Sequence, residues 1–223
     1  MKRIIISIFA LSMFFNTNAQ VEKGAIALMG GIHVLNDMQR EELGSLGTTY
    51  SRFNRTNVDF GGMYFLGTQF ALGAALLVNN SASLSGTDQN DLKLSSSRAL
   101  TGGRIFGRYY HPCFAPRFYT FGQVDLSFAG GANKSYDGDG NEEFVDNVSQ
   151  VGAGIRTGIS YFLIPAIALE MNFGLFGWQQ TTTTNSDAED IKSVNNTFEF
   201  LALSKTITLG FCWYLGRSGG FAN

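Results

Sequence analysis

The sequence has little cysteine, proline, histidine or charge, and each shortage excludes a class of protein. Its 223 residues include 2 Cys, 3 Pro and 2 His, and only 15% are charged. Two cysteines are too few for a disulfide-dense scaffold. A formal net charge of −2 leaves no basic excess of the kind that nucleic-acid-binding surfaces show. We therefore expect neither a disulfide-stapled small domain nor a nucleic-acid partner.

Long apolar runs are also missing beyond the first twenty residues. None there reaches the roughly 18 uninterrupted apolar residues of a candidate membrane-spanning helix. At the start of the chain, two basic residues precede an apolar run from Ile4 to Phe15, and Thr17-Asn18-Ala19 then places small residues before a cleavage point. This pattern predicts a secretory signal peptide over residues 1–19 and a single mature domain over residues 20–223.

Glycine and aromatic residues are abundant, and their arrangement favours β-structure. The chain has 27 Gly, 20 Phe and 8 Tyr, a composition more typical of strands than of helices. Apolar residues recur with a period of two, which is the period of a strand with two different faces. Eight strands are predicted from this alternation: Gly24–His33, Thr56–Leu66, Gln69–Val78, Ser97–Tyr110, Arg117–Phe128, Val151–Leu163, Ile167–Leu175 and Thr206–Leu215.

The connections between these strands alternate between long and short. The long, polar connections are Val34–Arg55, Asn79–Ser95, Gly130–Asn147 and Gln179–Asn196, and the short ones centre on Gly67, Cys113 and Ile164. Transmembrane barrels pair short periplasmic turns with long outer loops in this way. The prediction is an all-β fold: an eight-stranded antiparallel up-and-down transmembrane β-barrel.

The composition of the less apolar face of each strand indicates which of the two faces contacts lipid. It holds mainly Gly, Ala, Ser and Thr with about one charge or none per strand, whereas a water-facing sheet carries more Lys and Glu. We therefore expect this face to line a narrow lumen and the apolar face to contact lipid. A soluble, lipocalin-like ligand-binding barrel with its apolar face inward is the alternative. Aromatic residues near the strand ends suit interfacial girdles: Tyr64, Phe118, Tyr161, Trp178 and Trp213.

Three stretches, "GGRIFGRYYHP", "GAGIRTGISYFLIPAIALEMNFG" and "TITLGFCWYLG", carry a resemblance. With the signal ending "NTNAQ", they resemble the small eight-stranded outer-membrane β-barrel family of Gram-negative bacteria, OmpA-transmembrane-domain-like or OmpX-like. The resemblance implies a location in the cell outer membrane, with membrane lipid, lipopolysaccharide and the barrel assembly machinery as partners. Such barrels usually end on an aromatic residue, whereas this chain continues past Leu215 with a short tail, residues 216–223.

The predicted lumen face collects three acids and three arginines. A buried charge without a partner is costly, so near balance is what a closed lumen requires. Arg156 and Glu170 fall on the same face of neighbouring strands, at roughly diagonal positions, and we expect them to share an ion-pair network completed by Asp125 or Arg108. The predicted structural network is Asp59, Arg104, Arg108, Asp125, Arg156 and Glu170. A narrow ion-conducting channel is the alternative role for these charges.

No motif supplies chemistry, so we expect no enzyme, no metal and no cofactor. His33 and His111 have no partner that the sequence identifies, which leaves a lipid-modifying enzyme as a remote alternative. The acidic stretch Asp137–Glu143 begins like a calcium loop but lacks its Gly at position six and Glu at position twelve. The sequence leaves undecided whether Cys113 and Cys212 form a disulfide.

Most of the 18 acidic residues lie in the four long connections. We predict a structural or surface-interaction role, with an extracellular partner at these acidic loops.

Overall fold

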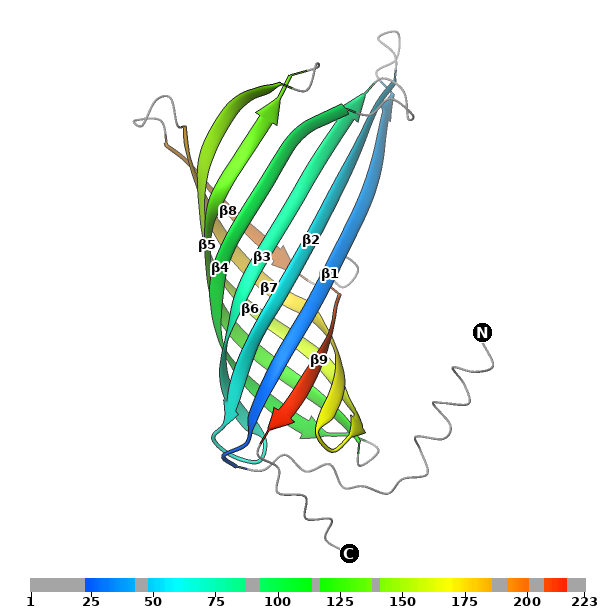
Figure 1. Cartoon of the computed structure of the whole chain (residues 1–223), viewed down its shortest axis with the longest axis vertical. Coiled ribbons are helices and arrows are strands. Elements are labelled where there is room, and N and C mark those ends of the chain that lie inside the picture. Colours follow the sequence, from blue (N-terminus) through cyan, green and yellow to red (C-terminus); the bar gives the residue numbers. More distant parts are fainter. Residues whose placement is uncertain are drawn as a thin grey trace, which may run out of the picture.

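The computed structural model describes residues 23–42, 48–86, 93–113, 117–137, 141–185, 192–200 and 207–215. These segments form one antiparallel sheet (Figure 1). Its strands are β1 (Ile26–Glu42), β2 (Thr48–Phe65), β3 (Phe70–Gly86), β4 (Lys93–Pro112), β5 (Phe118–Tyr136), β6 (Glu142–Ile164), β7 (Ile167–Asn185), β8 (Lys192–Phe200) and β9 (Thr208–Leu215). Within those segments, no helix has the length and apolarity needed to cross a membrane. The predicted signal peptide and the tail after Leu215 lie outside the described residues.

The sheet closes on itself through eight strands. From β1 to β7 each strand pairs with the next one along the chain. The ring is then completed by β9, which pairs with Ile167–Asn172 of β7 and with Ile26–Ile32 of β1. This confirms the predicted eight-stranded antiparallel barrel. The start of β1 and the end of β9 lie at the same end as the turns that join β2 to β3 and β6 to β7 (Figure 1).

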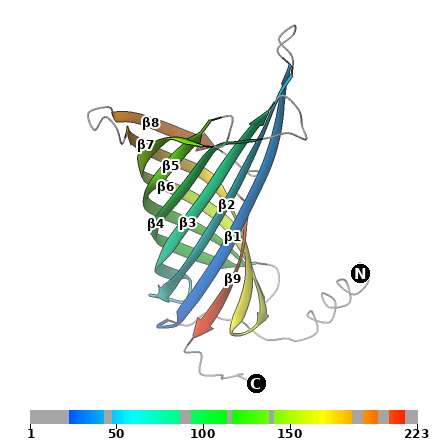
Figure 2. The same ribbon diagram turned by 45° about the horizontal axis from the view of Figure 1, so that its top comes forward.

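The ninth strand, β8, is one that the sequence pattern did not predict. It pairs with the upper part of β7, from Phe176 opposite Phe200 to Thr184 opposite Lys192. Among the described residues β8 has no pairing with β1, and the segment Val34–Glu42 of β1 pairs with β2 alone. Figure 2 shows β8 beside β7 at the upper rim, away from the upper end of β1. The eighth position of the wall is therefore shared between β9 below and β8 above.

Strands β1 to β7 are much longer than predicted, and the assignment of four long segments to loops is mostly wrong. Strands β1 to β7 contain 17 to 23 residues each. Most of the supposed loop segments 34–55, 79–95, 130–147 and 179–196 continue the wall of the barrel. The cause is that both faces are polar in the upper part of the wall, as at Asn79-Asn80-Ser81. A period of two in hydrophobicity cannot be seen where neither face is apolar.

The two faces of the wall are as expected. Outward side chains are apolar and exposed: Leu76 is 66% exposed, Val124 60% and Leu169 50%. Their inward neighbours are small or polar and buried, with Ala75 at 6%, Gln123 at 3% and Ala168 at 0%. A lipocalin-like barrel has the opposite arrangement, so the apolar exterior argues against a soluble ligand-binding barrel.

Two irregularities set the register between β6 and β7. The pairing shifts at Ile155/Arg156 and again at Phe162/Ile164. Arg156 therefore lies opposite Gly174, while Glu170 lies opposite Ser160. The two charged residues are separated by four positions along the strands, or about 13 Å. The predicted diagonal placement of Arg156 and Glu170 is wrong because the turn lies at Pro165-Ala166 and is not centred on Ile164, which changes the register of the whole hairpin.

Candidate functional site: a plugged lumen and a cavity above it

A buried ion pair joins β4 to β7 in the lower lumen. Nη1 of Arg108 donates to Oε2 of Glu170 at 2.7 Å, and the two side chains are 1% and 4% exposed. The same Nη1 donates to the Tyr110 hydroxyl oxygen at 2.9 Å, and that hydroxyl donates to Oε1 of Glu170 at 3.2 Å. A pair this deep is stable only when its other donors and acceptors also have partners. Tyr110 meets part of that requirement.

Gln123 connects this pair to a second one. Its Oε1 accepts from Nε and Nη2 of Arg108 at 2.9 and 2.8 Å, and its Nε2 donates to Oδ2 of Asp125 at 3.3 Å. Oδ2 of Asp125 also accepts from Nε of Arg156 at 2.9 Å. The structure therefore brings Arg156 and Glu170 into one polar chain, which runs through Asp125, Gln123 and Arg108. The two residues form separate ion pairs and no direct one.

Aromatic rings surround the buried arginine and fill the space beneath it. The guanidinium of Arg108 lies over the Phe121 ring, 4.1 Å from its centroid, where a cation is attracted to the ring face. Below, the rings of Tyr110, Phe65, Tyr214 and Phe162 contact one another in series, with centroids 5.0–5.8 Å apart. The five aromatic residues come from five strands, β2, β4, β5, β6 and β9, and none is more than 3% exposed. We call Arg108, Glu170, Gln123 and these aromatic residues the plug.

Two glycines make room for rings in the lower lumen. A Cβ added to Gly158 would collide with the Phe121 ring, and one added to Gly73 would collide with the Phe106 ring. Each glycine lies directly opposite its aromatic residue on the neighbouring strand, and the tip of the ring occupies the space that a Cβ would need. The glycines on the inner face therefore provide the space that its large aromatic side chains occupy.

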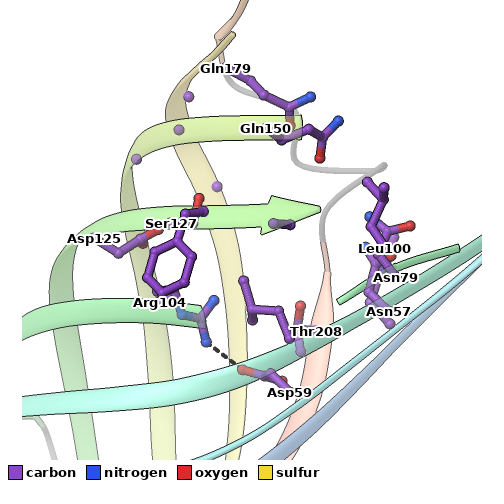
Figure 3. A pocket seen from close by; sticks show the side chains of 18 of the residues that line it. Asn57, Asp59, Asn79, Leu100, Arg104, Asp125, Ser127, Gln150, Gln179 and Thr208 are labelled. Carbon is purple, nitrogen blue, oxygen red and sulfur yellow. Dashed lines mark hydrogen bonds and ion pairs between the residues drawn. The ribbon is translucent and has the colours of Figure 1, made fainter. Parts of the chain in front are cut away.

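Above the plug, the lumen holds a cavity of about 450 Å³. Arg104 and Asp59 form an ion pair on its wall, and Asp125 and Ser127 lie nearby (Figure 3). An eight-stranded barrel is normally just wide enough to be filled by side chains. Here the walls contributed by β6 and β7 carry Gly152, Gly154, Gly174 and Gly177, which leave part of the interior empty.

The six residues of the predicted network divide between these two layers. Arg108 and Glu170 belong to the plug, and the other four line the cavity as the pairs Arg104–Asp59 and Arg156–Asp125. Arg55 and Arg98 also line the cavity and were not predicted from the sequence. Arg98 lies an even number of residues from Arg104 and Arg108 on the same strand, so its inward position could have been predicted. Arg55 could not, because it was assigned to a loop.

The remaining candidate residues of the sequence analysis lie at separate places in the described part of the chain. His33 lines the cavity at 9% exposure, while His111 is exposed at the lower end of β4. Cys113 and Cys212 are both free. Asp137 accepts hydrogen bonds from the backbone N–H and the side-chain amide of Asn141. No group of three or more His, Cys, Asp or Glu among the described residues could hold a metal ion.

Comparison with solved structures supports the fold, whereas comparison with sequences finds no match. No protein-family model matches the sequence, and no curated protein sequence does. The crystal structure of the outer membrane protein OprG from Pseudomonas aeruginosa is similar, with a TM-score of 0.51 and 10% identity over 88% of this chain and 98% of that chain. Weaker similarity is found with the crystal structure of Neisserial surface protein A (NspA), with a TM-score of 0.37 and 14% identity over 86% of this chain and 97% of that chain. At this identity, the likeness to OprG shows that the chain has the fold of a small outer-membrane β-barrel.

Proposed function

We propose that this chain is a non-enzymatic outer-membrane β-barrel that does not conduct, with a structural role or a role in interactions at the cell surface. The plug is the observation that carries the proposal. It closes the lower lumen with side chains from most of the strands of the ring, at exposures of 5% or less. A solute entering from above would meet the Arg108–Glu170 pair and the aromatic rings beneath it. This argues against a narrow channel.

The exterior supports insertion in a lipid bilayer. The exposed apolar residues occupy the outward positions of all the ring strands, as on Leu76, Val124 and Leu169, and an apolar surface of this extent needs lipid to cover it. The aromatic residues Tyr64 and Trp213, 47% and 49% exposed, lie on the outer face near the lower strand ends. Such positions suit the boundary between lipid and water.

The length of the wall supports a surface role. A tilted strand needs about 9–11 residues to cross the bilayer, and strands β1 to β7 have roughly twice that number. The lower end carries the short turns, so we place it in the periplasm, and the upper wall then stands above the outer leaflet. In this arrangement lipopolysaccharide surrounds the upper wall, and the barrel assembly machinery inserts the protein into the membrane. The acidic upper connections are then the part of the chain that an extracellular partner would contact.

Single-channel recording in planar bilayers tests the closed lumen. The refolded wild-type barrel should show no conductance steps, and a Phe121→Ala/Phe162→Ala variant, which opens the plug, should show them. Heat-dependent gel mobility of the membrane fraction verifies that both proteins are folded. Steady conductance of the wild-type barrel at low voltage would overturn the proposal and favour a narrow channel. Recovery of the mature protein in the soluble fraction would overturn the membrane location.

A further inference from the structure

We propose that the cavity above the plug binds a small oxyanion, carried by a carboxylate or phosphate group, between Arg55 and Arg98. The proposal goes beyond the role argued above and rests on the upper lumen alone. A barrel that conducted ions could still contain this site, and a closed barrel could lack it.

The register places the two arginines at the same level of the wall. Arg55 of β2 lies opposite Ser81 of β3, and Ser81 lies opposite Arg98 of β4. All three side chains face the cavity. The two backbones are separated by two strand spacings, or roughly 9–10 Å. Because arginine side chains are long, both guanidinium groups can reach one anion that lies over Ser81.

Among the described residues neither arginine has an acidic partner, in contrast to the other two arginines of the cavity. Arg104 pairs with Asp59, and Arg156 pairs with Asp125. Nε of Arg55 and both Nε and Nη2 of Arg98 are buried without a hydrogen-bond partner. Leaving such donors unsatisfied is costly, and a bound oxyanion would satisfy them. The guanidinium fork matches a carboxylate or a phosphate with two parallel hydrogen bonds.

The two positive charges also act on each other. Arg98 lies seven residues above Ile105 on β4, beyond the outward apolar belt. Burial lowers the pKa of the Arg98 guanidinium, and the positive charge of Arg55 lowers it further. A negative charge between the two groups would replace this repulsion with two attractions.

The rest of the cavity sets the size and character of the ligand. Its volume of about 450 Å³ falls within the range of roughly 300–1,000 Å³ that small-molecule sites occupy. Asn57, Asn79 and Gln150 offer amide groups, while Leu77 and Leu100 add a short apolar surface. The ligand that fits is a small, polar molecule with one anionic group at the arginines. The plug below would hold it on the upper side of the barrel.

Binding measurements on the full mature chain, refolded in detergent micelles, test the site. Isothermal titration calorimetry gives the Kd, and thermal unfolding gives the melting temperature, each with inorganic phosphate and with succinate. The variants are Arg55→Gln, Arg98→Gln, the double replacement and Arg52→Gln. Arg52 is the matched control because it lies on β2 three positions from Arg55, so its side chain points to the outer face. Heat-dependent gel mobility confirms that each variant is folded.

We expect one or both anions to raise the melting temperature of the wild-type protein in proportion to the logarithm of their concentration. Each single replacement should raise the Kd at least tenfold, the double replacement should abolish binding, and Arg52→Gln should bind like the wild type. Without anion, Arg98→Gln should melt no lower than the wild type, since it removes an unpaired charge. An unchanged melting temperature without anion would show that weaker anion binding by Arg98→Gln comes from loss of the site and not from loss of stability.

Two results would overturn the proposal: no binding of either anion by the wild-type protein at millimolar concentration, or equal binding by the double variant. A third arm uses micelles that contain a lipid with a phosphate headgroup. If only this lipid raises the melting temperature, and the double variant loses the effect, the oxyanion site stands and its ligand is a headgroup.

Discussion

Replacing Glu170 with Gln should leave Arg108 as a buried positive charge with no counter-charge. Arg108 is 1% exposed, so water cannot replace the lost carboxylate. The Gln side chain keeps an acceptor for Nη1, and Gln123 still accepts from Nε and Nη2, so the loss is chiefly that of the charge. Breaking a buried ion pair costs about 3–5 kcal/mol. We expect Glu170→Gln to lie near the lower limit.

Arg108→Met should cost more, near the upper limit. It removes the cation paired with Glu170 and takes both donors from Oε1 of Gln123. Among the described residues, Glu170 then keeps the Tyr110 hydroxyl at 3.2 Å. The double variant removes both charges together, so its loss should fall below the sum of the single losses by about 1–3 kcal/mol. The same cycle on Arg156→Met and Glu170→Gln should show a smaller coupling, because those residues belong to separate pairs.

Urea unfolding in lipid vesicles, followed by tryptophan fluorescence and by gel mobility, measures these free energies. Glu142→Gln serves as a control, since Glu142 pairs with Lys134 on the surface with both side chains more than 40% exposed. Such exposed pairs contribute little, and this replacement should have no measurable effect. If Glu170→Gln were as harmless as Glu142→Gln, or if the Arg108 and Glu170 losses were strictly additive, the lower lumen would be wet and the plug would not close it.

Two further predictions concern the wall. Leu169→Arg places a charge on the outward apolar face and should lower the free energy of unfolding in lipid by about 2–4 kcal/mol, whereas an unchanged urea midpoint would mean that this face does not meet lipid. Gly158→Ser should destabilise the barrel because its Cβ collides with the Phe121 ring and with the backbone carbonyl of Met171. Gly177→Ser should be tolerated because a Cβ there meets no atom within 4 Å. Equal urea midpoints for the two variants would contradict the packing described around Gly158.

Several features of this barrel are determined by the sequence itself. Alternation is a local property, so Leu169 and its neighbours at every second position could be assigned to one face without knowledge of any other strand. The small and sparsely charged character of the opposite face identified it as the interior. The scarcity of long apolar runs excluded helices as the spanning elements. These inferences predicted the ring of eight strands and the outward direction of the apolar side chains.

Other features were decided only by the tertiary structure, because they depend on contacts between strands far apart in the sequence. The turn at Pro165-Ala166 fixes the β6–β7 register, and in this register Arg156 and Glu170 lie four positions apart. Arg108 pairs with Glu170 because the curvature of the wall brings β4 and β7 together across the lumen. Where both faces are polar, as around Arg55, alternation carries no signal, and the upper wall and strand β8 could not be predicted. The cavity exists because glycines on β6 and β7 face arginines on β2 and β4, and only ring closure brings these walls together.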